Sequence, residues 1–347
     1  MAQDEKDEGD RDGGSVAILA ALLANLGVAV TKLVAFLLTG FSSMLAESVH
    51  SLADTGNQVL LLVGSRRARR SADLEHPFGF GQQRYVYSFV VAIMLFVLGG
   101  VFALYESYEK IREALGEDDY DPFASRWWWV PLAVLLVAMV LEGSSLRTAV
   151  RESNRIRGRR SWLRFVRTTK SPELPVVLLE DFGAIIGLAL ALLGVGLTLL
   201  TANPVWDGLG SGAIGVLLVL LAAFLAVEMS SLLVGEAAIP EVRARIIAAL
   251  ESPEAVDRVI NSRTMHLGPD EVLVAAKLAV GATDSAAEVT AAINEAERAV
   301  REGLPGMRIV IYLEPDLDAS PGSPSVDGPG GVVADPRESA VEDASRG

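Results

Sequence analysis

Cysteine is absent from this chain of 347 residues, which excludes disulfide bonds and thiolate metal sites. The sequence also lacks an HExxH motif and any recognisable pairing of a nucleophile with a base. We therefore expect neither an enzyme nor a bound prosthetic group. Basic residues number 30 against 44 acidic ones, and the resulting net charge of −14 argues against nucleic acid as a partner.

Hydrophobic residues make up 51% of the chain, and the mean hydropathy is +0.37. These values are too high for an average soluble protein and too low for a protein that is membrane throughout, so we expect a membrane domain joined to a polar one. Residues 1–14 and 317–347 are charged or rich in glycine, proline and serine, which predicts disordered tails. The first twelve residues are acidic, so a cleaved signal peptide is not expected.

Six segments are long and apolar enough to cross a hydrocarbon core of roughly 30 Å as helices. They are residues 15–39, 42–65, 86–107, 127–149, 173–200 and 208–235. Arginine and lysine gather in the loops after the second and fourth segments, whereas the loop after the third is mainly acidic. The positive-inside rule then places both termini in the cytoplasm, and we expect a multi-pass protein of the plasma (inner) membrane.

Residues 239–316 have a different pattern from the membrane domain at 15–238. A helix, two strands around a Gly-Pro turn, a second helix and a third strand follow one another in the order αββαβ. This order predicts a small cytoplasmic α+β domain of the ferredoxin-like type. Such modules often support dimerisation, so we expect a homodimer.

The second segment carries Glu47, His50, Asp54 and Asn57 at a spacing that forms one stripe along a helix. Ionisable groups at this depth are costly and usually face a cavity, a partner or a transported ion. His50 and Asp54 are one turn apart and can reach the same ion, for which Zn²⁺ is the best match and Mn²⁺, Fe²⁺ and Co²⁺ are competitors. Glu47 lies nearer the outer surface, where a vestibule or interface role is the alternative.

A second acidic pair, Glu180 and Asp181, lies in the fifth segment. At the rise of an α-helix, Asp54 and Asp181 both lie about 12 Å from the inner edge of the membrane. Two different helices therefore place a carboxylate at the same level.

The other polar residues of these segments have structural interpretations. Ser51, Thr55 and Gln58 are expected to form interhelical hydrogen bonds. Lys32 and Glu142 are lone charges in the first and fourth segments, and we expect buried ion pairs or snorkelling side chains rather than ligands.

The stretch FSSMLAESVHSLADTGNQ, followed by ADLEHPFGFGQQRY, resembles the cation diffusion facilitator family of zinc and related metal transporters. The acidic pair, the six segments and the αββαβ tail extend the resemblance over residues 15–315, and it is strongest for the branch that contains the mitochondrial zinc transporter. The resemblance implies a proton-driven antiporter in a lipid bilayer. It also implies a tetrahedral metal site at mid-membrane, built from paired positions on the second and fifth segments.

By this resemblance, His50 and Asp54 match the pair in the second segment, and Asp181 matches the second member of the pair in the fifth. The first member falls at Val177, which has no donor atom. The candidates for the fourth place are Glu180, Glu47, Asn57 and water. Glu180 points about 100° away from Asp181 on a regular helix, so it would need a helix irregularity or an unusual rotamer.

The accessory metal sites of such transporters are incomplete in this chain. Asp73 and His76 match two ligands of a loop site, but Phe80 stands where a further histidine is expected, and helix capping and loop packing are the alternatives. In the tail, the ligand positions of relatives are occupied by Ile260, Ala276, Tyr312 and Glu314. His266 is expected to be an ordinary turn or interface residue, and metal sensing by the tail is not expected.

Metal binding requires a neutral imidazole and ionised carboxylates, so it displaces protons, and His50 is the natural proton carrier. The sequence thus predicts export of Zn²⁺ from the cytoplasm at His50, Asp54 and Asp181 while protons move inward. One alternative is a non-transporting metal-binding or regulatory membrane protein on the same scaffold, which the missing fourth ligand favours. Another is a carrier of organic cations, but the second and fifth segments have few aromatic residues to line its cavity.

Overall fold

The computed structural model describes residues 25–116, 121, 123 and 126–317, in two compact units that divide between Gly235 and Glu236. The tails expected at 1–14 and beyond 317, together with residues 15–24 of the first segment, lie outside the described residues. Leu317, expected to begin the second tail, is instead the last residue of a strand.

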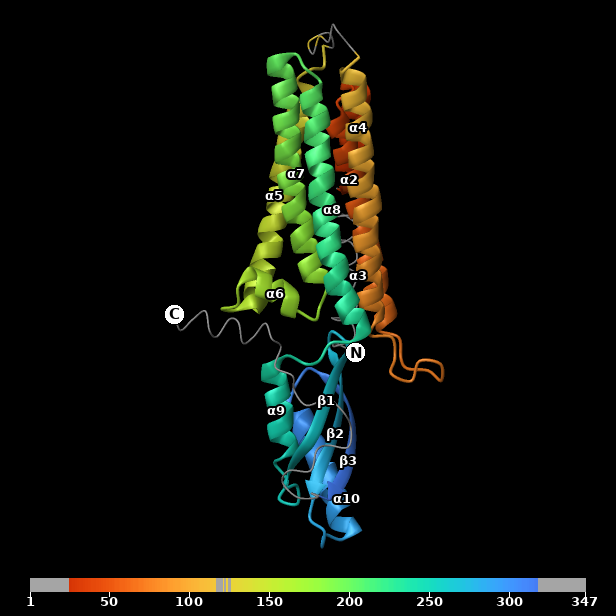
Figure 1. Ribbon diagram of the computed structural model, residues 1–347, viewed down its shortest axis with the longest axis vertical. Coiled ribbons are helices and arrows are strands. Elements are labelled where there is room, and N and C mark those ends of the chain that lie inside the picture. Colours follow the sequence, from red (N-terminus) through yellow and green to blue (C-terminus); the bar gives the residue numbers. More distant parts are fainter. Residues whose placement is uncertain (1–24, 117–120, 122, 124–125, 318–347) are drawn as a thin grey trace, which may run out of the picture. The chain divides into compact units, whose positions relative to one another are not determined.

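The first unit is a bundle of long helices that run side by side (Figure 1). Its elements are the helix Asn25–Thr39, α2 (Ser42–Ala68), α3 (Gln83–Met94), the π-helical η1 (Leu95–Val101), α4 (Phe102–Ala114), α5 (Val130–Arg157), α6 (Trp162–Thr168), α7 (Glu173–Thr201) and α8 (Val205–Val234). The elements α3, η1 and α4 form one continuous helix, Gln83–Ala114. Gly40, at a φ of 73°, separates the first helix from α2 with a backbone conformation that favours glycine.

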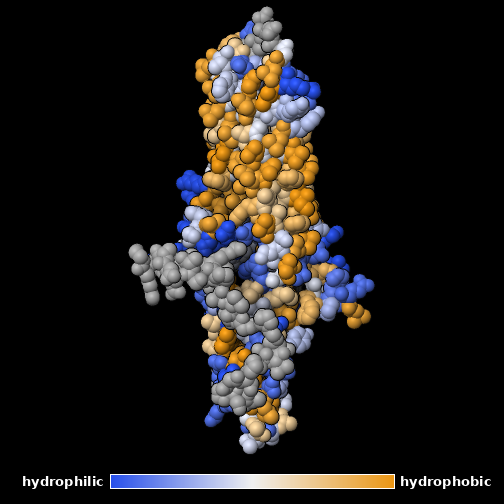
Figure 2. All heavy atoms as spheres, in the orientation of Figure 1, coloured by the Kyte–Doolittle hydropathy of each residue, from blue (hydrophilic) through white to orange (hydrophobic). Residues whose placement is uncertain are grey.

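Four described helices are long and apolar enough to cross a membrane: Gln83–Ala114, α5, α7 and α8. The length of α2 would suffice, but its polar stripe lowers its hydropathy, and the first segment is described only from residue 25. Hydrophobic side chains cover much of the outside of this unit (Figure 2), as in α5, where Val137 and Val140 are 60% and 73% exposed. The chain is therefore a helical membrane protein, and the count of six spans remains a prediction.

Small residues allow α7 and α8 to approach closely, as is common between membrane helices. A Cβ atom at Gly194 of α7 would lie 3.0 Å from the carbonyl oxygen of Trp206 and 3.3 Å from the Cα atom of Gly210, both of α8. Apolar side chains such as Leu135, Leu188 and Ile214 fill the interior of the bundle. This tight packing holds α7 in a fixed rotation relative to its neighbours.

The second unit contains a three-stranded sheet and two helices. Its elements are α9 (Pro240–Leu250), β1 (Arg258–Gly268), β2 (Glu271–Val280), α10 (Ala286–Gly303) and β3 (Arg308–Leu317). Strands β1 and β2 are antiparallel, with His266 opposite Val272, and β3 joins β2 in parallel, with Val274 opposite Ile311. The element order is the predicted αββαβ, whereas the ferredoxin-like classification remains a prediction.

Candidate metal site

The polar side chains of α2 point into the bundle. Glu47, His50 and Asn57 are buried, with at most 2% of each exposed. His50 Nε2 lies 3.5 Å from Asp54 Oδ2, and neither ring nitrogen of His50 forms a hydrogen bond with a described residue. Because buried polar atoms usually have partners, an unpartnered imidazole against a carboxylate is a donor set available to a cation.

Glu47 belongs to a buried ion pair through one carboxylate oxygen, and its other oxygen, Oε1, forms no hydrogen bond with a described residue. Lys32 Nζ donates to Glu47 Oε2 at 2.9 Å and to Ser51 Oγ at 2.7 Å. Lys32 is thus an ion-pair member, and Ser51 forms an interhelical hydrogen bond, both as predicted. The prediction for Thr55 is wrong, because its hydroxyl donates to the Ser51 carbonyl of its own helix at 3.0 Å.

The acidic pair of α7 reaches two different helices. Asn57 Nδ2 of α2 donates to Glu180 Oε1 at 2.7 Å, and Ser145 Oγ of α5 donates to Asp181 Oδ2 at 2.8 Å. Glu180 therefore approaches α2 from a regular α-helix, and its place as the fourth ligand remains a prediction. The carboxylates of these two consecutive residues diverge, as neighbours on a helix do.

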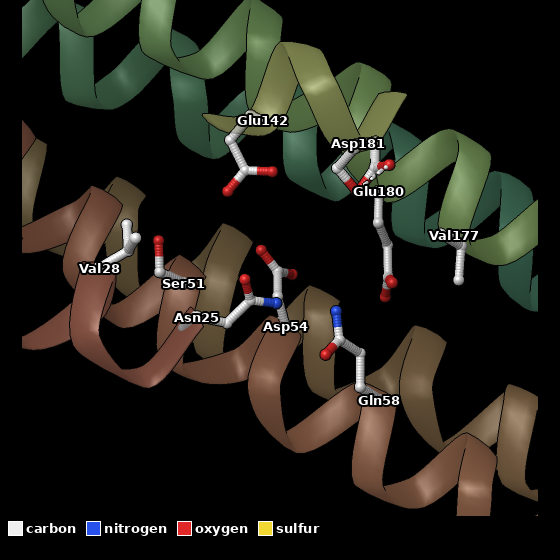
Figure 3. Close-up of a pocket in the computed structure, with 10 residues that line it drawn as sticks. Asn25, Val28, Ser51, Asp54, Gln58, Glu142, Val177, Glu180 and Asp181 are labelled. Carbon is white, nitrogen blue, oxygen red and sulfur yellow. Dashed lines mark hydrogen bonds between the residues drawn. The ribbon is translucent and has the colours of Figure 1, made fainter. Parts of the chain in front are cut away.

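A cavity of about 30 Å³ lies between the helix Asn25–Thr39, α2, α5 and α7 (Figure 3). Its volume suffices for a water molecule or a metal ion. The lining residues are Asn25, Val28, Ser51, Asp54, Gln58, Glu142, Ser145, Val177, Glu180 and Asp181. They include four carboxylates from three helices and no basic side chain, so the cavity is strongly acidic.

No three His, Asp or Glu side chains among the described residues converge closely enough to hold one metal ion. Ser145 instead holds Asp181, and Asn57 holds Glu180. Val177 lines the cavity where the resemblance expects a ligand, and it presents only methyl groups. Metal binding at the predicted residues would therefore require these side chains to move closer together.

The contribution of α5 to the cavity is only weakly indicated by the amino-acid sequence. Glu142 was expected to pair with a base or to snorkel, but it lines the cavity and forms no ion pair with a described residue. Ser145, three residues further on, was not singled out at all. A charge in an apolar segment was visible in the sequence, but the side of α5 that faces α7 depends on tertiary packing.

The predicted loop site is held together by local contacts instead of converging ligands. Asp73 Oδ1 accepts the backbone N–H groups of Glu75 and His76 at 3.0 and 2.7 Å, and both Asp73 and His76 are about half exposed. The hydrogen bond from the His76 backbone lowers the pKa of Asp73 below its usual value. The Phe80 ring lies 4.4 Å from that of His76, so loop packing describes these residues well.

In the second unit, His266 does not lie in a turn as expected, and a role at an interface remains a prediction. It lies near the end of β1 and is 4% exposed, within a run of three consecutive buried residues, His266, Leu267 and Gly268. Ala276 is buried in β2, Tyr312 is 60% exposed, and Glu314 Oε1 lies 3.4 Å from Lys277 Nζ.

Carboxylates that line a cavity inside a bundle of apolar helices are typical of membrane proteins that bind or transport cations. Residues 18–234 match the family model described as the cation efflux transmembrane domain. The chain therefore belongs to the cation efflux, or cation diffusion facilitator, family. Membership in this family of transporters confirms the expectation that the chain is not an enzyme.

The chain is similar to proteins named "Proton-coupled zinc antiporter SLC30A9, mitochondrial" from Xenopus laevis and Homo sapiens, at 34% and 32% identity over 262 residues. It is 26% identical over 257 residues to "Metal tolerance protein C4" of Arabidopsis thaliana. These alignments cover 75%, 75% and 73% of this chain but 45%, 44% and 54% of the three relatives. The chain thus spans about half the length of the curated relatives it matches.

Proposed function

We propose that this chain is a proton-coupled antiporter that exports a divalent cation, foremost Zn²⁺, through His50, Asp54 and Asp181. The cavity between α2, α5 and α7 carries the proposal, because Asp54 and Asp181 both line it and His50 lies against Asp54. Imidazole nitrogen and carboxylate oxygen are ligands that Zn²⁺ accepts, and Mn²⁺, Fe²⁺ and Co²⁺ compete for the same donors. The names of the vertebrate relatives support zinc and proton coupling.

Exchange follows from the chemistry of these donors. Histidine binds a metal only when neutral, and carboxylates bind it when ionised, so an entering cation displaces protons and a returning proton expels the cation. Asp181 leaves Ser145 when it turns to the metal. The candidates for the fourth ligand are Asn57, Glu180, Glu47 and water. Asn57 Oδ1 is buried without a hydrogen bond, and Glu47 could bind once it separates from Lys32.

Metal flux into proteoliposomes under an imposed pH gradient tests this function. Wild-type protein should move Zn²⁺ and protons in opposite directions, and Asp54→Ala or Asp181→Ala should abolish the flux while the protein still folds. Glu152→Gln removes an exposed carboxylate of α5 that pairs with Arg155, and it serves as the matched control. Full flux in both alanine variants would refute the assignment of the site.

A non-transporting, metal-binding regulator on the same scaffold is the second candidate function. Val177 at a ligand position and the absence of a preformed ligand cluster among the described residues favour it. Calorimetric titration of the purified protein alongside the flux assay separates the two functions. Metal binding without flux for Zn²⁺, Mn²⁺, Fe²⁺ and Co²⁺ would establish the regulator.

We also propose that both termini face the cytoplasm, since the basic loops fall on one side of six spans. The plasma membrane is the location proposed from the sequence, whereas the vertebrate relatives are named as mitochondrial proteins, which argues for an organelle membrane. Fractionation of cells that express the tagged chain, followed by protease accessibility of each terminus, decides both points.

The domain organisation and the assembly are proposals of the same kind. We propose a transport domain at 15–238, an αββαβ domain at 239–316 and a homodimer supported by the second of these. Light scattering of the purified protein should give the mass of two chains. A truncation after residue 238 should then shift it to the mass of one.

A further inference from the structure

Glu142 is a charged residue that the site described so far does not use. It lies within the apolar α5 and forms neither a hydrogen bond nor an ion pair with any described residue. In Figure 3 its carboxylate points into the cavity toward the side where Asp54 lies. A carboxylate in a membrane helix is costly unless it has a partner, so its position calls for a ligand.

The cavity itself indicates that this ligand is a cation. Four carboxylates from three helices and no basic side chain line a space of about 30 Å³, so the lining attracts a cation and repels an anion. Lys32 is not this cation, since its ammonium group is bound to Glu47 and Ser51.

A second observation, independent of the acidic residues, points to the same kind of ligand. His50 is 2% exposed, both of its ring nitrogens lack a hydrogen bond, and Nε2 is directed at Asp54 on the cavity wall. A buried imidazole that forms no hydrogen bond and lies against a carboxylate is a donor pair suited to a cation.

Two polar residues of α5, Glu142 and Ser145, line this cavity. Glu142 and Ser145 are three residues apart, so they lie on the same side of the helix, and Ser145 already holds Asp181. Across the cavity, Val177 contributes no donor. A third helix can thus supply the oxygen that α7 lacks.

We propose that Glu142 is a ligand of the transported metal, in the fourth place that Val177 leaves without a donor. This inference rests on the proposed function and adds α5 to the helices that hold the ion. The bound metal would then have one imidazole and three carboxylates as donors. A set so rich in oxygen binds Mn²⁺ and Fe²⁺ well in addition to Zn²⁺.

The test is metal binding by the full chain in detergent, with four variants compared by calorimetric titration. Glu142→Gln should weaken Zn²⁺ binding by about 10-fold or more. Glu142→His should restore Zn²⁺ binding and raise the ratio of Zn²⁺ to Mn²⁺ affinity, because nitrogen replaces oxygen. Glu152→Gln is the control on the same helix. Asp54→Asn tests whether Zn²⁺ binds at the proposed site at all.

The visible spectrum of bound Co²⁺ gives a second readout that does not depend on transport. It should change in Glu142→His, which replaces an oxygen donor by nitrogen, and stay as in the wild type in Glu152→Gln. Elution as a single species in size-exclusion chromatography establishes that each variant is folded.

The remaining outcomes distinguish a failure of the Glu142 inference from a failure of the proposed metal site. If Asp54→Asn abolishes binding but Glu142→Gln behaves as Glu152→Gln does, Glu142 is not a ligand and the proposed function stands. If folded Glu142→Gln and Glu142→His weaken binding equally, Glu142 has a structural role and the inference fails. If neither Asp54→Asn nor Glu142→Gln changes binding, the proposed site fails as well.

Discussion

Lys32 Nζ lies 2.9 Å from Glu47 Oε2, and both side chains are almost completely buried, at 1% and 0% exposed. The pair joins the first described helix to α2, three residues before His50. Removing one member of a buried pair is far more damaging than removing both, because the remaining charge has no solvent. The ion pair therefore fixes α2, and it engages one of the two carboxylate oxygens of Glu47.

Lys32→Met should lower the free energy of unfolding by about 3–5 kcal/mol. The double variant Lys32→Met, Glu47→Gln should recover much of this loss, since no buried charge is left. Reversible unfolding in mixed detergent micelles measures both. Arg112→Met breaks an exposed pair with Glu109 and should cost less than about 1 kcal/mol. A double variant no more stable than Lys32→Met would contradict this account of the pair.

Asp207 of α8 supplies the cap that α2 does not provide for itself. Its carboxylate accepts the Ser42 backbone N–H at 2.6 Å, the Ser42 hydroxyl at 2.9 Å and the Ser43 backbone N–H at 3.3 Å, and it also accepts from the Ser43 hydroxyl. These groups are the free donors of the first turn of α2, and a negative charge is favourable there.

Asp207→Asn should lower the free energy of unfolding by about 2 kcal/mol or more, because charge-assisted hydrogen bonds are lost. Ser211→Ala removes only a contact of 3.1 Å with the Ser42 hydroxyl and should cost about 1 kcal/mol or less. Zn²⁺ affinity of folded Asp207→Asn, measured by calorimetric titration, should remain within two-fold of the wild type. An equal effect of the two substitutions on unfolding would show that the cap is unimportant.

The bounds of the helices could be predicted from the sequence, but the directions in which their polar side chains point could not. The apolar runs predicted α7 and α8 to within three residues at each end, because hydrophobic length alone determines them. By contrast, Asp207 lies 165 residues from Ser42 along the chain, and nothing in the first turn of α2 indicates such a cap. Glu142 faces the cavity and Thr55 bonds its own helix for the same reason, since side-chain direction depends on neighbouring helices.

An ion-pair group on the strands of the second unit predicts a pH dependence. Lys277 Nζ lies 3.1 Å from Asp316 Oδ2, which raises the pKa of Lys277 and helps to lower that of Asp316 below 3.8. The lowered pKa of Asp316 means that its contribution is present above its unfolded pKa and is lost as pH falls through the folded value. The raised pKa of Lys277 means that its contribution is present below its unfolded pKa and is lost as pH rises through the folded value.

Lys277→Met should therefore loosen β2 and β3 at neutral pH, and its difference from the wild type should vanish as the medium becomes more acidic than pH 3.8. Hydrogen exchange of the strand amides, compared between the two proteins at each pH, measures this difference. Arg298→Met, which breaks an exposed contact of 4.0 Å with Glu295, is the control and should show no such trend. A difference that persists at strongly acidic pH would mean that Lys277 acts through packing and not through charge.

If Asp181 binds the metal as we propose, Ser145 competes with the metal for this carboxylate. Its hydroxyl donates to Asp181 Oδ2 at 2.8 Å and holds the carboxylate toward α5, so in the proposed site this hydrogen bond is lost when Asp181 turns toward His50 and Asp54 to bind the cation. Ser145→Ala should therefore increase Zn²⁺ affinity several-fold, since the net free energy of one hydrogen bond is about 1 kcal/mol. Calorimetric titration of the purified chain measures the change. Ser144→Ala is the adjacent control, because the Ser144 hydroxyl donates to the Leu141 carbonyl of its own helix. If Ser145→Ala weakens Zn²⁺ binding relative to Ser144→Ala, the hydroxyl orients Asp181 for the metal and does not compete with it.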